Sequence, residues 1–327
     1  MDTPFKVSVR LITYNHEQFI AQAIEGVLAQ KTDFPVELII ADDFSTDNTL
    51  KIAQQYSGIP NITVTILNRQ KGDTYWVKRQ QLGRLYNNTD SYSKCTGKYI
   101  ALLDGDDFWI DPRKLQKQVD FLEAHPDFAI CFHDINKCWV NDAGETWITD
   151  APNIKREVST FENLCEEGSF IQTSSVVIRN GLIKQFPDWY YKAPYGDWPL
   201  YLLLAEHGKI EKLGEIMSSH REHSGGIYKN QFKGGSFGIH ALQLIKTLDT
   251  HFKHKYHKYF YAHNRILTLT NMALNYSRNT KSFSQTLYYT YKMMVLKSKD
   301  TKLNGENIKK LFRLIFRTIG LKKRVAD

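Results

Sequence analysis

Strand-like runs and helix-like segments alternate along the first two-thirds of the 327-residue chain, and this order constrains the fold more than any other feature. The first run alternates polar and apolar residues and the second is continuously apolar, whereas the segments between the runs place apolar residues at helical spacing. The runs are Lys6–Ile12, Val36–Ala41, Ile62–Leu67, Tyr99–Leu103 and Phe128–His133. Strands that alternate with helices form a mostly parallel sheet, and such sheets bind ligands beyond the carboxyl ends of their strands.

Three connecting segments carry helix-start signals. Asn15 is a suitable N-cap, with Gln18 at the third helical position. Ser45 can cap a helix that runs to about residue 56, and Pro112 suits a first helical position. We therefore expect helices to begin next to Asn15, Ser45 and Pro112.

After about residue 235 the pattern contains helices only. We expect these helices at Leu242–Phe252, Phe260–Tyr276, Phe283–Leu296 and Ile308–Ile319. Gly234 and Gly235 mark the change of pattern. The sequence thus predicts an α/β domain of residues 1–235 and a basic helical region of residues 236–327.

Positive charge is concentrated in this helical region. Residues 241–327 hold 18 Lys and Arg against 4 Asp and Glu, although the whole chain has a net charge of only +8. Such a block indicates contact with phospholipid or nucleic acid, or a solvated helical face. The apolar stripe of residues 308–319 is typical of a helix on an anionic membrane surface, and equally of a helix docked on the protein body. Because no nucleic-acid-binding signature is present, we expect no nucleic-acid partner.

The remaining sequence features concern the compartment. No run approaches the roughly 18 uncharged apolar residues of a membrane-spanning helix, and the N-terminus does not resemble a signal peptide. The cysteines show no paired spacing for a zinc site or a disulfide framework, so we expect reduced packing residues. They are Cys95, Cys131, Cys138 and Cys165. We expect a cytoplasmic protein, and the basic helix raises the hypothesis of peripheral attachment to the inner face of the membrane.

Three carboxylates follow the strand-like run Tyr99–Leu103. They are Asp104, Asp106 and Asp107, with Gly105 permitting a tight turn between them. Oxygen ligands at this density suit Mg²⁺ or Mn²⁺ shared with a substrate diphosphate. The alternative is a solvated acidic turn without a ligand.

A second acidic pair, Asp42 and Asp43, follows the run Val36–Ala41 and should reach the same edge of the sheet. A carboxylate here can accept a hydrogen bond from the ring N–H of uracil or thymine, which adenine lacks. A turn that caps the next helix would explain one of the two aspartates without any function.

Three segments in order, each of which ends a strand, resemble the signatures of family 2 glycosyltransferases with the GT-A fold. They are residues 13–17 (TYNHE), residues 38–49 (LIIADDFSTDNT) and residues 97–109 (GKYIALLDGDDFW). The resemblance covers about residues 5–225. Within the family, the chain resembles bacterial enzymes that build surface polysaccharide or lipopolysaccharide. This resemblance implies a Rossmann-like α/β sheet, a nucleotide-sugar donor and a divalent cation, Mn²⁺ or Mg²⁺.

The resemblance also implies roles for individual residues. The first loop and the second strand line the donor nucleotide, which corresponds here to Thr13, Tyr14, Asn15, Glu17 and Asp43. The acidic turn holds the donor and the cation, with Asp104 and Asp106 on the donor and Asp106 and Asp107 on the metal. The sequence does not decide which two of the three carboxylates bind the metal. Gly83 and Asn87 match only in part a further donor-binding stretch of the family.

Two later motifs complete the predicted site. Asp197, in Gly-Asp-Trp, resembles the family's catalytic base, although an aspartate there can also serve only as a helix cap. Arg221 and His223 resemble an Arg-x-His that closes over the diphosphate, so we expect Arg221 on phosphate and His223 on metal or phosphate.

These observations predict an inverting, metal-dependent glycosyltransferase, of hexosyl or N-acetylhexosaminyl type, that uses a UDP-sugar. A single base and a metal-held leaving group suit in-line displacement, which inverts the anomeric centre. The acceptor would be a hydroxyl of a saccharide or lipid-linked glycan. A dTDP-sugar enzyme such as a rhamnosyltransferase is the first alternative. A nucleotidyltransferase is a second, but it usually has a Gly-rich basic loop after its first strand, and residues 13–17 do not form one.

Overall fold

The computed structural model describes residues 4–57, 62–151, 154–226, 232 and 235–298. Contacts divide the chain into two compact units, residues 1–224 and residues 225–327. The expected boundary at Gly234 and Gly235 falls inside the second unit, and Gly234 itself is outside the described residues. All strands of the described residues lie in the first unit.

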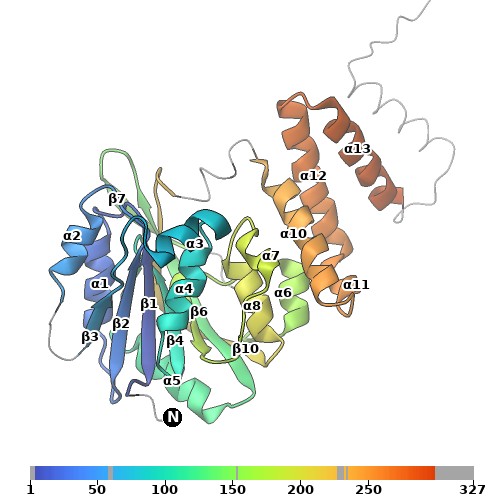
Figure 1. Cartoon of the computed structure of the whole chain (residues 1–327). Helices are drawn as coiled ribbons and strands as arrows, with labels where there is room; N and C mark the ends of the chain where they lie inside the picture. Colours follow the sequence, from blue (N-terminus) through green and yellow to red (C-terminus); the bar gives the residue numbers. More distant parts are fainter. Residues whose placement is uncertain (1–3, 58–61, 152–153, 227–231, 233–234, 299–327) are drawn as a thin grey trace, which may run out of the picture. The chain divides into compact units, whose positions relative to one another are not determined.

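The first unit is built on one ten-stranded sheet (Figure 1). Its strands are β1 (Val7–Thr13), β2 (Val36–Asp42), β3 (Thr63–Ile66), β4 (Tyr99–Asp104), β5 (Phe108–Trp109), β6 (Phe128–Val140), β7 (Thr146–Asp150), β8 (Val158–Ser159), β9 (Val177–Arg179) and β10 (Lys209–Glu222). The main order is β3-β2-β1-β4-β9-β6-β10-β5, with β7 beside β6 and β8 beside β10. The expected parallel part is present from β3 to β4 and between β6 and β10, whereas β9, β5, β7 and β8 add antiparallel pairs. The α/β class is thus confirmed, with a mixed sheet.

Helices cover both faces of this sheet. They are α1 (Ile20–Leu28), α2 (Thr49–Gln54), α3 (Thr74–Leu82), α4 (Tyr86–Lys94), α5 (Lys114–Ala124), α6 (Phe161–Glu167), α7 (Asp188–Tyr191) and α8 (Asp197–Ala205), with a short 3₁₀ helix, η1 (Thr173–Ser175). Val7, Val9 and Leu11 of β1 pack in one core with α1, because alternate residues of a strand share a face. Arg10 points to the other face, where its guanidinium donates to the Asn88 carbonyl of α4.

Side chains that we expected to cap helices bind neighbouring loops instead. Asn15 has a left-handed backbone (φ 55°), and its side-chain carbonyl accepts the backbone N–H of Thr46 at 2.8 Å. The Ser45 hydroxyl donates to the Asp42 carboxylate at 2.5 Å. The expected helix starts are therefore wrong by a few residues, and α1, α2 and α5 begin at Ile20, Thr49 and Lys114.

Gly97 lets the start of β4 approach β1. A Cβ atom at Gly97 would lie 2.6 Å from the Ser8 backbone nitrogen, and backbone cannot move aside as a flexible side chain can. We expect Gly97→Ala to lower the free energy of unfolding by about 1–3 kcal/mol, measured by urea denaturation. Gly214→Ala is the matched control, because nothing lies within 4 Å of a Cβ there. Equal stability of the two variants would contradict this reading of the β1–β4 contact.

Lys114 is fully buried at the start of α5, with its ammonium 2.8 Å from Gln118 Oε1 and 4.2 Å from the centre of the Trp109 ring. Burial lowers the pKa of Lys114 to about 7, whereas a lysine in the unfolded chain titrates near about 10.4. Between these values the unfolded chain binds the extra proton, so stability rises with pH and the cost of burying the charge is greatest below pH 7.

We therefore expect Lys114→Met to have a higher free energy of unfolding than the wild type. This difference should be largest below pH 7 and should shrink steadily toward pH 10.5. Denaturation curves across this pH range measure it. Lys192→Met, at an exposed position, should show no such trend. A difference that stays constant with pH would show that Lys114 keeps its charge in the folded protein.

The second unit is all-helical in its described part, as the sequence predicted. It contains α10 (Phe237–His251), α11 (His257–Phe260), α12 (His263–Asn279) and α13 (Phe283–Ser298). Gly238 brings α10 close to α12, because a Cβ there would lie 2.5 Å from the Leu269 carbonyl oxygen. The expected helix Ile308–Ile319 lies outside the described residues.

The cysteines and the helices bear on the compartment of the protein. All four cysteines are buried and free, as expected. Among the described residues, no helix combines the length and the apolar character needed to cross a membrane.

Candidate active site

The ends of β2, β1 and β4 meet at one edge of the sheet. The register pairs Thr13 with Asp42 and Ile12 with Asp104, so the two acidic segments emerge on either side of β1. Gly105 fixes this approach, since its N–H donates to the Ile12 carbonyl at 2.8 Å and a Cβ would lie 2.5 Å from Thr13 Oγ1. The expected convergence of acidic residues at the strand ends is therefore present.

Asp106, His223 and His16 come together beside this edge. His223 Nε2 lies 3.2 Å and His16 Nε2 lies 3.7 Å from Asp106 Oδ2. Thr13 orients His16, because its hydroxyl lies 3.2 Å from the other ring nitrogen. Burial by itself raises the pKa of Asp106, but the hydrogen bond with His223 and the charges of nearby histidines bring that pKa below its usual value. Burial lowers the pKa of His16, which favours the neutral imidazole that a metal ligand requires.

Asp106 Oδ2 lies near one nitrogen of each imidazole, although among the described residues these three atoms do not all lie within 4.8 Å of one another. Carboxylate suits Mg²⁺ and Mn²⁺, whereas imidazole suits transition metals, so the donor set fits Mn²⁺ better than Mg²⁺. Two of the predicted metal ligands, Asp106 and His223, thus lie together. His16 was not predicted as a ligand, although it lies in the motif of residues 13–17.

Asp107 is 2% exposed, and its hydrogen bonds go to β10. Its Oδ1 accepts the backbone N–H of Arg221 at 2.9 Å, and the His220 ring nitrogen lies 3.1 Å away. Burial lowers the pKa of His220, but the Asp107 carboxylate outweighs this effect and raises the pKa to about 9. Asp107 therefore fastens the acidic turn to β10, whereas we predicted it as a metal ligand.

The Arg221 guanidinium supports the same turn. It donates to the Asp106 carbonyl at 2.5 Å and to the Gln22 side chain. It also lies between two rings, 4.9 Å from the centre of Phe19 and 4.4 Å from that of Phe108. We expected Arg221 to pair with phosphate, but in this structure its donors bind the protein and position Asp106.

Asp43 is held by α3. Arg79 Nε and Nη2 lie 2.9 and 2.8 Å from Asp43 Oδ2, and the Tyr75 hydroxyl donates to Oδ1 at 2.8 Å. Neither Tyr75 nor Arg79 was predicted from the sequence, although their spacing of four residues places them on the same face of a helix. Asp43 lies at the end of β2, as predicted. Arg79 and Tyr75 occupy some of the positions at which its carboxylate can accept hydrogen bonds.

Other predicted donor residues join the first two loops. The Glu17 carboxylate accepts the backbone N–H of Asn48 at 3.0 Å, and Asn15 binds Thr46 as described above. These bonds hold residues 13–19 against residues 43–49. The Tyr14 side chain is 47% exposed beside them, so it is accessible to a ligand.

Gly83 and Asn87 lie at the junction of α3 and α4. Gly83 has a φ of +86°, which favours glycine at this turn. Asn87 is buried, accepts from Arg69 at 2.7 Å and donates to the Ala41 carbonyl at 3.2 Å. Arg69 in turn donates to the Asp42 carbonyl at 2.9 Å, so Asn87 and Arg69 together hold the end of β2.

Asp197 is the first residue of α8 and is partly buried. Its Oδ2 accepts from the Ser169 hydroxyl at 3.3 Å, and burial raises the pKa of its carboxyl. Gly196, the residue before Asp197, lies close to α4. A Cβ atom at Gly196 would be 2.6 Å from the side-chain nitrogen of Asn88. Burial raises the pKa of the Tyr201 hydroxyl in α8, and the charges of Asp197 and Asp104 raise it further. A carboxyl with a raised pKa is suited to accept a proton.

A mixed α/β sheet whose strand ends carry this acidic turn is the GT-A fold of glycosyltransferases. The chain belongs to glycosyl transferase family 2, because the sequence model of that family matches residues 8–180, more than half of the chain. An uncharacterized protein of Mycobacterium tuberculosis, Rv1520, is 35% identical over 229 residues, which are 69% of this chain and 61% of that protein. This chain thus matches about three-fifths of the length of that relative.

Two solved structures have a similar fold. TarS 1–349 of S. aureus in complex with UDP-GlcNAc gives a TM-score of 0.51 at 16% identity, with 92% of this chain and 93% of that chain covered. The mannosyltransferase PcManGT of Pyrobaculum calidifontis, in complex with GDP-Man and Mn²⁺, gives a TM-score of 0.52 at 15% identity, with 97% and 86% covered. At these identities the likeness concerns the fold alone.

Proposed function

We propose that this protein is an inverting, metal-dependent glycosyltransferase that moves a sugar from a UDP-sugar to a hydroxyl of a saccharide or lipid-linked acceptor. The observation that carries the proposal is the 3.2 Å approach of His223 to Asp106, next to an acidic turn at the strand ends. Membership of glycosyl transferase family 2 supports the reaction type.

Asp106, His223 and His16 are the residues that would hold the cation. A divalent ion bound there supplies Lewis-acid stabilisation of the negative charge on the leaving diphosphate. Asp107 and Arg221 contribute indirectly, since they fasten the turn that carries Asp106. We assign Asp104, at the carboxyl end of β4, to the ribose and diphosphate of the donor.

Asp197 is the proposed general base. The acceptor hydroxyl must lose a proton as it attacks the anomeric carbon, and a carboxylate within hydrogen-bond reach can take that proton. The raised pKa of Asp197 increases its basicity at neutral pH. A single base on one side of the sugar and a held leaving group on the other lead to direct displacement, and therefore to inversion.

Asp43 is the proposed contact of the nucleotide base. Arg79 and Tyr75 hold this carboxylate at the end of β2, and we assign its oxygens as the acceptors of the ring N–H of uracil. Thymine presents the same edge, so a dTDP-sugar is the second candidate. Complexes of similar folds with UDP-GlcNAc and with GDP-Man indicate that this fold accommodates different bases.

The acceptor is proposed from the sequence. Residues 241–327 hold 18 Lys and Arg against 4 Asp and Glu, and this excess of positive charge suits an anionic membrane surface on the cytoplasmic side and hence a lipid-linked acceptor. Synthesis of a polysaccharide or another glycoconjugate is the pathway that this acceptor implies.

Calorimetric titration of UDP, dTDP, GDP and CDP tests the donor class. We expect UDP to bind most tightly with Mn²⁺ present and to lose at least about tenfold in affinity without it, because the cation neutralises the diphosphate. Equal binding of all four nucleotides would contradict the role of Asp43. Binding that is indifferent to Mn²⁺ would contradict the metal site.

A further inference from the structure

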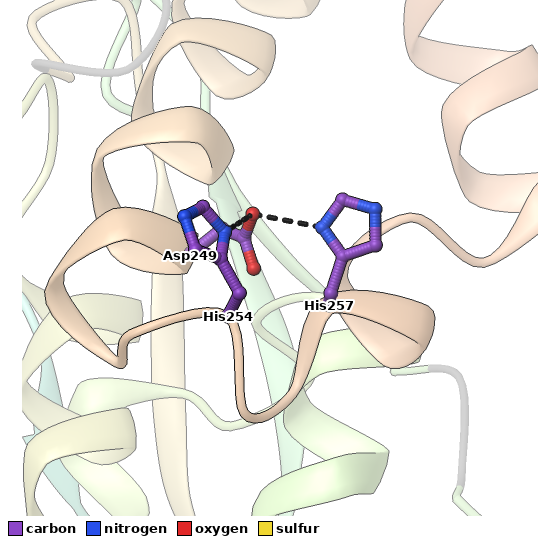
Figure 2. Close-up of side chains that lie close together, drawn as sticks. All are labelled: Asp249, His254 and His257. Carbon is purple, nitrogen blue, oxygen red and sulfur yellow. Dashed lines mark hydrogen bonds and ion pairs between the residues drawn. The ribbon is translucent and has the colours of Figure 1, made fainter.

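Three ligand-type side chains of the second unit gather where α10 is followed by α11. Figure 2 shows Asp249 from α10, His254 from the connection and His257 from the start of α11. The Asp249 Oδ2 atom lies 2.7 Å from His254 Nδ1 and 2.9 Å from His257 Nδ1. The three possible ligand atoms all lie within 4.8 Å of one another.

The protein provides hydrogen-bond partners for only one of the two oxygens of the Asp249 carboxylate. The residue is only 3% exposed, and its Oδ1 atom is buried without a hydrogen-bond partner. Burial of a carboxylate is costly unless it is paired, and an unpaired buried oxygen adds to that cost. A divalent cation at this position would neutralise the charge of the carboxylate and give its oxygens a partner.

The two imidazoles are placed as metal ligands would be. Their side chains are 65% and 59% exposed, which leaves room for an ion and for coordinated water. Ligands of a tetrahedral zinc ion lie about 3.3 Å apart, so each of the two ring nitrogens would move about half an ångström away from Asp249 Oδ2 to accommodate an ion. His257 also stacks on Tyr261 at 4.5 Å between ring centres, which restricts its orientation.

The backbone brings His254 to this place at some cost. Lys253 and His254 both have left-handed backbones, with φ of 50° and 60°, and the His254 N–H donates to the Asp249 carbonyl at 2.8 Å. The chain therefore folds back on the end of α10. A metal bound by all three side chains would staple this turn and join α10 to α11.

We propose that Asp249, His254 and His257 bind one transition-metal ion of the zinc type, at a site of three protein ligands that is distinct from the proposed active site. One carboxylate oxygen and two imidazole nitrogens with a water molecule match the coordination of Zn²⁺. Such an ion stabilises the folded state because the unfolded chain does not hold the three ligands together.

Nearby lysines limit the affinity of this cluster for a metal ion. Lys253, Lys255 and Lys258 flank the cluster and oppose a cation, although two of these ammoniums lie over aromatic rings, at 4.6 Å from Tyr256 and 4.5 Å from Tyr259. A hydrogen-bonded Asp–His cluster without an ion is the competing interpretation. It predicts no metal affinity.

The test uses the full chain with Asp106→Asn as a common background, which weakens metal binding at the proposed active site. Co²⁺ replaces Zn²⁺ as the probe, because four-coordinate Co²⁺ absorbs strongly in the visible. We expect about one equivalent of Co²⁺ to give this absorption and Zn²⁺ to displace it. We expect His254→Gln and His257→Gln each to weaken binding at least about tenfold.

His251→Gln is the matched control, since His251 is exposed, close in sequence and outside the cluster. It should leave the titration unchanged. Both ligand variants alter exposed side chains, so circular dichroism should show an intact fold. Absence of the absorption in the background protein, or an unchanged titration in His254→Gln and His257→Gln, would overturn the proposal.

Discussion

Asp197→Asn should reduce the rate of sugar transfer by about 10³-fold while nucleotide affinity stays within about twofold of the wild type. The amide has the size of the carboxylate and can still accept from Ser169, but it cannot take a proton from the acceptor hydroxyl. The loss should therefore appear in kcat. Single-turnover transfer and calorimetric titration of UDP measure the two quantities separately.

Asp188→Asn is the control for this change. Asp188 is also the first residue of a helix, α7, but it is exposed. Both variants remove a carboxylate from the first residue of a helix, so Asp188→Asn shows what this change does where no catalytic role is proposed. Comparable transfer rates in the two variants would show that Asp197 serves only as a helix-terminal residue.

The positions of the acidic residues could be predicted because they depend on local pattern. The apolar runs fixed β1, β2 and β4, and parallel pairing then brought Thr13, Asp42 and Asp104 to one edge. The resemblance added Asp197 and His223, which are remote in sequence and which the residue pattern alone would not have joined to the acidic turn.

The partners of these residues could not be predicted in the same way. His16 reaches Asp106 because Gly105 brings β4 against Thr13, and no periodicity in the sequence reports such an approach. The helix starts failed for a similar reason: Asn15 and Ser45 have the right chemistry for caps, but each binds another loop residue. Asn and Ser side chains can form hydrogen bonds with several nearby backbone or side-chain groups, and the tertiary contacts determine which of these bonds forms.

Asp106→Asn should remove the Mn²⁺-dependent part of nucleotide binding. We expect the affinity for UDP with Mn²⁺ to fall about 100-fold, to the value that the wild type shows in the presence of a chelator. Asparagine keeps the shape of the side chain and its contact with His223, but it lacks the negative charge that a divalent cation requires. Calorimetry with and without Mn²⁺ measures the effect in both proteins.

Two further variants make this result specific. Asp142→Asn changes an exposed carboxylate in the turn between β6 and β7 and should bind UDP and Mn²⁺ as the wild type does. His223→Gln should weaken Mn²⁺-dependent binding less than Asp106→Asn, since it removes a neutral ligand and leaves the carboxylate in place. Asp107 fastens the turn through the Arg221 backbone, so we do not assign it to the metal. If Mn²⁺-dependent binding survived in Asp106→Asn but was lost in Asp107→Asn, Asp107 would be the metal ligand and Asp106 would not.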